Sequence, residues 1–158
     1  MGKRAKREPV EVELSALVSD AASEITSLKE EIEEWRDNMS NANMEHLPKW
    51  EEVSEAADAL DQAESQAQDA ENTFDGLPDA AKVLKAKYLA GKTTSRSSRA
   101  GECGAMLRIV ADRLRELAEM DEKLEKPKGV EPVDYEEAAE ALESAADELD
   151  NVSFPGMY

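Results

Sequence analysis

The sequence predicts an all-α protein of about five helices, arranged as two antiparallel, coiled-coil-like hairpins in an elongated bundle. Apolar residues recur at alternating steps of four and three over long segments, as in a helix packed along another helix. Hydrophobic residues make up 41% of the chain but aromatic residues only 4%. Close contacts between alanine-rich helices suit this composition better than one large core. Segments rich in proline, glycine and asparagine separate the periodic stretches.

The first predicted hairpin covers residues 11–74. Its first helix has apolar positions at Leu14, Val18, Ala21, Ile25, Leu28, Ile32, Trp35 and Met39. SNANMEHLP then interrupts the pattern and indicates a turn. The second helix has apolar positions at Trp50, Val53, Ala57, Leu60, Ala63, Ala67, Ala70 and Phe74. Because the connection is short, the two helices are expected to be antiparallel neighbours.

The predicted helical domain spans residues 11–158. After the first hairpin, it is predicted to consist of a basic middle segment and a second hairpin. Residues 75–100 are expected to form a short basic helix, over 79–90, and a linker. The second hairpin covers residues 101–152, with apolar positions at Cys103, Leu107, Val110, Leu114, Leu117 and Leu124, then at Tyr135, Ala138, Leu142, Ala145, Leu149 and Val152. Asp134, three residues before Glu137, has the spacing of a helix N-cap.

The net charge of −18 is unevenly distributed along the chain. Residues 8–75 hold 20 acidic and 3 basic residues, and residues 129–158 hold 9 acidic residues and no basic one. Residues 76–101 hold 1 acidic and 6 basic residues. Residues 1–10 begin with MGKRAKR and are expected to be a disordered basic tail. An acidic surface usually keeps a helix solvated; used functionally, it implies basic partners or imitation of a nucleic acid.

The middle segment contains a candidate basic patch and a GKT motif. The patch consists of Lys82, Lys85, Lys87, Lys92, Arg96 and Arg99. We expect it to neutralise the acidic hairpins, within or between chains, rather than to bind phosphate backbones, because its acidic flanks oppose nucleic acid. GKT is not expected to be a phosphate-binding loop, because Ala86 stands where the first glycine should be and a helix is predicted before it.

No catalytic, cofactor-binding or metal site is predicted, so we expect no enzymatic activity. His46 is the only histidine and lies in a predicted turn, without the Glu-x-x-His spacing of di-metal bundles. The glutamates at 30, 31, 33 and 34 lie beside the apolar positions and are expected to be solvated. Cys103 is the only cysteine, which excludes a disulfide within the chain and agrees with a reducing cytosol. No apolar run is long enough for a membrane span.

A candidate partner surface lies around the first turn and in the C-terminal tail, residues 153–158. It consists of Trp35, Met39, Met44, Trp50, Phe154, Met157 and Tyr158. Trp35 and Trp50 are more simply explained by packing on each other, which would close the hairpin; the alternative is an exposed aromatic anchor for a partner. The FPGMY tail either folds back on the hairpin, which we favour, or inserts into a neighbouring molecule.

Two motifs resemble a pattern in small, uncharacterised bacteriophage-encoded proteins. The first is LKEEIEEWRDNMSNANMEHLPKWEEVSEAADALDQA, and the second is the Ser95-Arg96-x-x-Arg99 segment that leads into Ala105-Met106-Leu107. The resemblance covers about half of the chain. It implies a phage protein in a bacterial host, in the host cytoplasm or in the virion, and it transfers no activity and no site residues.

Three functions remain open from the sequence. The first is a non-catalytic interaction or oligomerising protein, such as a phage accessory or host-modulating factor, whose partner is a host or phage protein or a second copy. The second is an acidic nucleic-acid mimic that inhibits a host DNA- or RNA-binding protein. The third is a structural component of the virion. We expect a homo-oligomer, no direct nucleic-acid binding and no membrane partner.

Overall fold

The computed structural model describes residues 8–91, 95–123 and 133–155. The elements in chain order are β1 (Val10–Glu13), α1 (Leu14–Asn41), α2 (Pro48–Asp75), α3 (Asp79–Lys82), β2 (Lys85–Tyr88), α4 (Arg96–Glu122) and α5 (Tyr135–Asp150).

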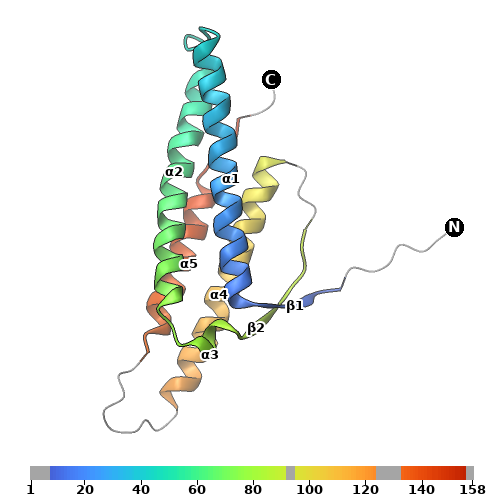
Figure 1. Ribbon diagram of the computed structural model, residues 1–158, viewed down its shortest axis with the longest axis vertical. Coiled ribbons are helices and arrows are strands. Elements are labelled where there is room, and N and C mark those ends of the chain that lie inside the picture. Colours follow the sequence, from blue (N-terminus) through green and yellow to red (C-terminus); the bar gives the residue numbers. More distant parts are fainter. Residues whose placement is uncertain (1–7, 92–94, 124–132, 156–158) are drawn as a thin grey trace, which may run out of the picture.

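In the described ranges, four long helices form an antiparallel bundle (Figure 1). α1 packs against α2 and α4, and α5 packs against the same two helices. Around the bundle the order is therefore α1, α2, α5, α4, and each helix runs opposite to both of its neighbours. The predicted all-α class and the two helical hairpins, α1–α2 and α4–α5, are confirmed.

The predicted apolar positions form the core. In α1 they are all buried except Trp35, which is half-buried. In α2 they are all buried except Trp50, also half-buried. In α4 and α5 the central positions are buried, whereas Leu117, Tyr135 and Val152 pack at the ends of the core and Leu124 lies outside the described residues. The structure adds Leu17 and Leu77 to the core.

The α1–α2 hairpin extends beyond the rest of the bundle. α1 and α2 have 28 residues each, or about 42 Å at 1.5 Å per residue, whereas α5 has 16 residues, or about 24 Å. Arg96, the first residue of α4, lies over the ring of Trp35. The last turns of α1 and the first turns of α2 therefore project past the start of α4 (Figure 1). The turn between them is closed at Asn43, which has a φ of 56° that asparagine tolerates.

A short two-stranded sheet replaces part of the expected basic helix. Only residues 79–82 are helical, and β2 pairs antiparallel with β1, with Val10 opposite Tyr88 and Glu13 opposite Lys85. Residues 10–13 are likewise a strand, although residues 1–10 were expected to be disordered and the first helical hairpin was expected to begin at residue 11. The alternation of VEVE and KAKY puts Val12, Ala86 and Tyr88 toward the core, and this tertiary contact outweighs the helix propensity of Ala, Leu and Lys.

The helix caps follow the local sequence. The Ser95 side chain accepts a hydrogen bond from the Ser98 N–H at 3.1 Å, and the Ser98 hydroxyl accepts one from the Ser95 N–H, so α4 begins in a capping box. α4 thus starts at Arg96, earlier than predicted. The predicted cap of α5 is confirmed, since the Asp134 carboxylate accepts from the Glu137 N–H at 2.9 Å. Within the described ranges, no helix is both long and apolar enough to cross a membrane.

Candidate functional site

In the described part of the chain, six basic side chains each reach from one long helix to a neighbouring one, and we call them the inter-helix cations. They are Lys29, Arg36, Arg96, Arg99, Arg108 and Arg115. Lys29 of α1 contacts Asp61 of α2 at 2.9 Å and Glu64 at 3.1 Å. These two carboxylates raise the pKa of Lys29 above its ordinary value, so the side chain stays charged.

α4 is joined to α1 by two arginines. Arg99 binds Glu31 at 2.6 Å and also donates to Glu24. Arg96 lies 3.4 Å from Glu31 and 5.5 Å above the centre of the Trp35 ring, a cation–π arrangement. The hydrogen bonds from Arg99 lower the pKa of Glu31, which favours its charged form.

α4 is joined to α5 in the same way. Arg115 contacts Glu136 at 3.1 Å and Glu143 at 2.6 Å, and the hydrogen bond from Arg115 lowers the pKa of Glu143. Arg108 contacts Asp147 at 3.1 Å and also Asp150. The α2–α5 contact differs, because no ion pair between these two helices occurs among the described residues.

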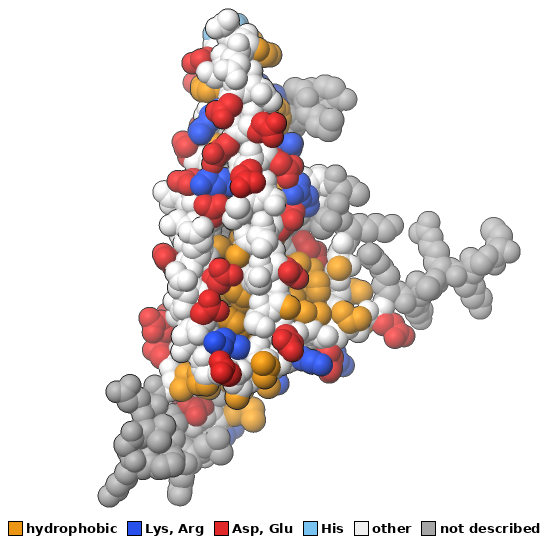
Figure 2. Space-filling view, in the orientation of Figure 1, with side chains coloured by type: hydrophobic (Ala, Val, Ile, Leu, Met, Phe, Trp, Pro, Cys, Tyr) orange, Lys and Arg blue, Asp and Glu red, His pale blue; other side chains and the backbone are white. Residues whose placement is uncertain are grey.

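The inter-helix cations leave exposed carboxylates on the outside of the hairpin. Glu30, Glu34 and Asp37 of α1 are exposed and have no ion-pair partner in the described part of the chain. We call these three residues the α1 stripe. They are four and three residues apart, so they lie along one side of the helix at steps of about 6 and 4.5 Å. Figure 2 shows acidic side chains spread over α1 and α2, with basic ones beside them.

The predicted basic patch is divided by the fold. Arg96 and Arg99 are held against α1, and Lys82 pairs with Asp79 at 3.3 Å. Lys85 and Lys87 are exposed on β2, opposite Glu13 and Glu11. Lys92 lies outside the described residues. Arg96 and Arg99 therefore neutralise acidic residues within the chain, as expected, and the five described residues of the patch do not form one continuous basic surface.

The predicted partner surface is also divided. Met39 is only 4% exposed and belongs to the core, so its inclusion in an exposed surface was wrong. Trp35 and Trp50 are half-buried against the core, while Met44 in the turn is 38% exposed. Phe154 packs on the core, which confirms that this part of the tail folds back. Met157 and Tyr158 lie outside the described residues.

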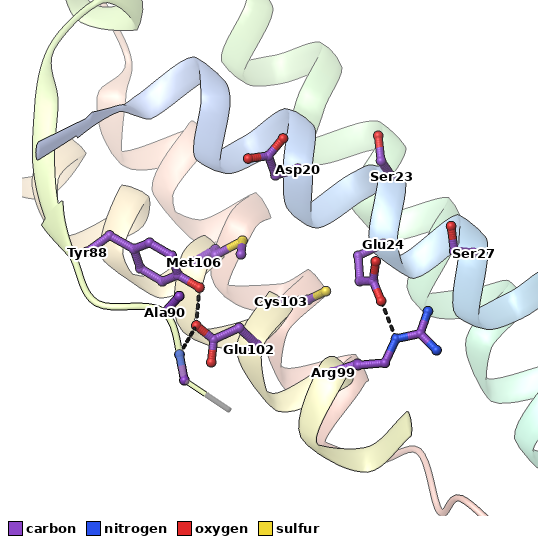
Figure 3. Close-up of a pocket in the computed structure, with 11 residues that line it drawn as sticks. Asp20, Ser23, Glu24, Ser27, Tyr88, Ala90, Arg99, Glu102, Cys103 and Met106 are labelled. Carbon is purple, nitrogen blue, oxygen red and sulfur yellow. Dashed lines mark hydrogen bonds and ion pairs between the residues drawn. The ribbon is translucent and has the colours of Figure 1, made fainter. Parts of the chain in front are cut away.

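A groove of about 720 Å³ lies between α1, the end of β2 and the start of α4 (Figure 3). We call it the Tyr88 groove. Tyr88 and Glu102 point toward each other, and the Tyr88 hydroxyl donates to the Glu102 carboxylate. The same carboxylate oxygen accepts from the Gly91 N–H at 3.1 Å. The remaining lining residues are Asp20, Ser23, Glu24, Ser27, Ala90, Arg99, Cys103 and Met106.

The groove does not have the chemistry of a phosphate site. The GKT motif does follow a strand, so the expectation of a preceding helix was wrong. However, the Gly91 N–H, which a phosphate-binding loop would direct at its ligand, is bound to the Glu102 carboxylate. Asp20, Glu24 and Glu102 make the groove acidic, and Arg99 is already paired with Glu24 and Glu31. An anion would therefore be repelled.

Cys103 has the properties of a structural residue. Its side chain is 1% exposed, and burial, together with the charge of Glu24, raises its pKa to about 12. The thiol is therefore protonated at neutral pH, whereas a nucleophile needs the thiolate. Among the described residues, no cluster of three or more histidine, cysteine or acidic side chains has the arrangement of a metal site.

Comparison with protein-family models, with curated proteins and with solved structures gives no significant match.

Sequence reasoning missed the Tyr88 groove. Tyr88 was assigned to a helix, and its bond to Glu102, fourteen residues away, depends on β2 turning the ring toward α4. The alternation in KAKY, together with that in VEVE, was the available signal for two paired strands.

Proposed function

We propose that this chain is a non-catalytic interaction protein whose partner is a basic protein. The observation on which the proposal depends is the division of charge between the interfaces and the surface. The six inter-helix cations are engaged between helices, while the carboxylates of the α1 stripe face solvent without a cation partner among the described residues.

Such a surface favours a basic partner for two physical reasons. Exposed like charges attract a partner of opposite sign over about one Debye length, which raises the rate of encounter. The helices also present the carboxylates on a fixed backbone, so little backbone conformational entropy is lost on binding. Two copies of the chain would repel each other across the α1 stripe, so a homo-oligomer would have to form through a different face.

The resemblance to bacteriophage proteins suggests a biological setting. A small acidic interaction protein in an infected cell suits an accessory or host-modulating factor that binds a basic host protein in the cytoplasm. A virion component that binds a basic phage protein uses the same surface. Both settings need the same chemistry and differ in the partner.

Nucleic-acid mimicry is a second candidate, and the spacing of the α1 stripe favours it. Carboxylates at steps of about 6 and 4.5 Å along one helix form a regular line of negative charge. A DNA- or RNA-binding protein holds its own basic residues in a line to contact phosphates. In this candidate the basic partner is a nucleic-acid-binding protein, and nucleic acid competes for it.

Affinity capture with two charge-matched baits tests the proposal. The first bait carries E30Q, E34Q and D37N, which remove the α1 stripe. The second carries D112N, E119Q and E122Q, which remove three exposed carboxylates of α4 that form no ion pair among the described residues. Each bait is loaded with bacterial lysate and washed at increasing salt concentration. Separately, light scattering gives the mass of each purified bait protein in solution.

We expect a basic protein to be retained by the wild-type chain and by the α4 variant, released as salt rises, and lost from the α1 variant. Release by added DNA would favour the mimic. Equal retention by both variants would contradict the proposal, and so would a partner that salt does not release.

A further inference from the structure

We propose that the Tyr88 groove receives an extended basic segment of the partner protein, with an arginine or lysine side chain placed between Asp20 and Tyr88. This inference rests on the proposed function and adds to it a second contact, separate from the α1 stripe.

The shape of the groove suits an extended segment. Its α1 side is lined from Asp20 to Ser27, a rise of about 10 Å along the helix. At about 3.3 Å per residue, this length matches three residues of extended chain. Ser23 and Ser27 place hydroxyls along that side, and a hydroxyl both donates to and accepts from a peptide backbone. The volume of about 720 Å³ is in the usual range for a bound small ligand or a few residues.

The charge of the groove selects a cation. Asp20 has no hydrogen-bond or ion-pair partner among the described residues, although it lines the groove. Glu102 binds Tyr88 and Gly91, which are both neutral, so its negative charge is not cancelled. Of the lining residues that the structure describes, Arg99 alone is basic, and it is held between two carboxylates.

The titration of two groove residues agrees with this geometry. Burial raises the pKa of Tyr88, and the nearby charges of Glu102 and Asp20 raise it further. Burial and the charge of Glu24 raise the pKa of Cys103, and the charge of Arg99 offsets only part of this rise. The carboxylate contributions to both shifts indicate a negative environment, which favours a bound cation over a bound anion.

The groove also has apolar surface for the flanks of such a segment. Met106 and Cys103 line its α4 side, and the Tyr88 ring lies beside Glu102 (Figure 3). The guanidinium of an arginine can stack on that ring while its aliphatic stem covers Met106. Figure 2 shows hydrophobic side chains gathered at the edge of the bundle beside α1. The exposed side chains near the groove include Leu89, which is 49% exposed.

A short designed peptide tests the inference. The probe is acetyl-Val-Arg-Val-Arg-Val-amide with a fluorescent label, and the reference probe has glutamine in place of both arginines. Binding is measured by fluorescence anisotropy, and its location is measured by the NMR shifts of the Gly91 and Glu102 amides. Two substitutions act on the groove: Asp20→Asn removes the free carboxylate, and Ser23→Arg adds a competing cation.

Each substitution has a matched control on α2. Asp69→Asn makes the same change in net charge as Asp20→Asn, and Ser65→Arg makes the same change as Ser23→Arg. Both control positions are exposed. All four changes are at surface-accessible positions, and circular dichroism checks that each variant is folded.

We expect the arginine probe to bind more tightly than the glutamine probe and to shift the Gly91 and Glu102 amides. Asp20→Asn should weaken binding about five-fold, the effect of losing one partly screened ion pair, and Asp69→Asn should have little effect. Ser23→Arg should weaken binding by more than Ser65→Arg.

The inference would be overturned if the groove variant and its control weakened peptide binding equally. It would also be overturned if the peptide changed the NMR shifts only of residues around the α1 stripe. Neither result would affect the proposed function, because the α1 stripe variant tests that function in lysate, independently of the groove. If the α1 stripe variant loses capture of the basic protein and the peptide does not bind in the groove, the proposed function stands. In that case the groove is not a binding site for a basic segment.

Discussion

The α1–α4 and α2–α5 contacts lie on opposite sides of one bundle and are held in different ways. On the first side, Arg96 and Arg99 of α4 bind Glu24 and Glu31 of α1. On the second side both helices are acidic, and no ion pair joins them in the described ranges. Asp61 and Glu64 of α2 reach toward α1. Ala56, Ala63 and Ala70 recur every seven residues on the other flank of α2 and are buried, so we place them against α5.

The difference shows how a chain with a charge of −18 can fold without covering its surface with cations. Where small residues allow two helices to approach closely, packing stabilises the contact despite the like charges on the outside. At the other three helix contacts, basic side chains cross the interface, and among the described residues four of them each join two carboxylates: Lys29, Arg99, Arg108 and Arg115. The basic residues are thereby placed between the helices, and the outer carboxylates stay free for a partner.

The largest expected effect on stability comes from a change in the alanine-lined contact between α2 and α5. Ala63→Leu adds three carbon atoms at a fully buried position, and overpacking of this kind typically costs about 1–3 kcal/mol in the free energy of unfolding. Ala105→Leu on the exposed side of α4 is the control and should change this free energy by less than about 0.5 kcal/mol. Urea unfolding measures both variants. An Ala63→Leu variant as stable as the wild-type chain would show that the α2–α5 contact is loosely packed.

The next effect is on the α1–α4 contact. Arg99→Met keeps much of the side-chain length but leaves Glu24 and Glu31 without their shared cation. Loss of hydrogen bonds to charged groups that are still about one-third exposed should lower the free energy of unfolding by about 1 kcal/mol. Lys123→Met, at an exposed position after α4, is the matched control. Equal urea midpoints for the two variants would contradict a stabilising role for Arg99.

A pH series isolates Glu31. Its folded pKa is lowered by Arg99, so its charged form stabilises the fold above its ordinary pKa of about 4.3. That contribution is lost as the pH falls through the lowered value. The wild-type chain should therefore be more stable than Glu31→Gln at pH 7, by up to about 1 kcal/mol, and the difference should shrink toward zero once the pH has fallen through the lowered pKa. A difference that is constant over this range would mean that Glu31 acts through shape and not through charge.

The smallest effect is that of salt. Salt weakens the inter-helix ion pairs, but it also weakens the repulsion across α2–α5 and over the acidic surface. Because the net charge is −18, the second effect should dominate. Raising sodium chloride from about 20 to about 200 mM should raise the melting temperature by about 1–3 °C. A lower melting temperature in salt would mean that the ion pairs contribute more than the repulsion.

The sequence predicted the helices better than the site. Each long helix repeats its apolar residues over several turns, so the buried positions from Leu14 to Met39, except Leu17, could be identified without the structure. The β1–β2 pair could not be distinguished in the same way, because four residues are too few for a clear period and KAKY also has good helix formers. Whether Lys29 or Arg99 faces solvent or a neighbouring helix depends on how the helices are rotated, which local patterns do not determine. The same holds for Tyr88 and Glu102.

The most direct test of the account is to reverse the charge of the α1 stripe. One bait carries E30K, E34K and D37K, and the control bait carries D112K, E119K and E122K on α4, so both change the net charge equally. We expect that the α1 bait no longer retains the basic protein from lysate, while the α4 bait retains it. Retention of the same basic protein by both baits would contradict the claim that the outer carboxylates of α1 form the binding surface.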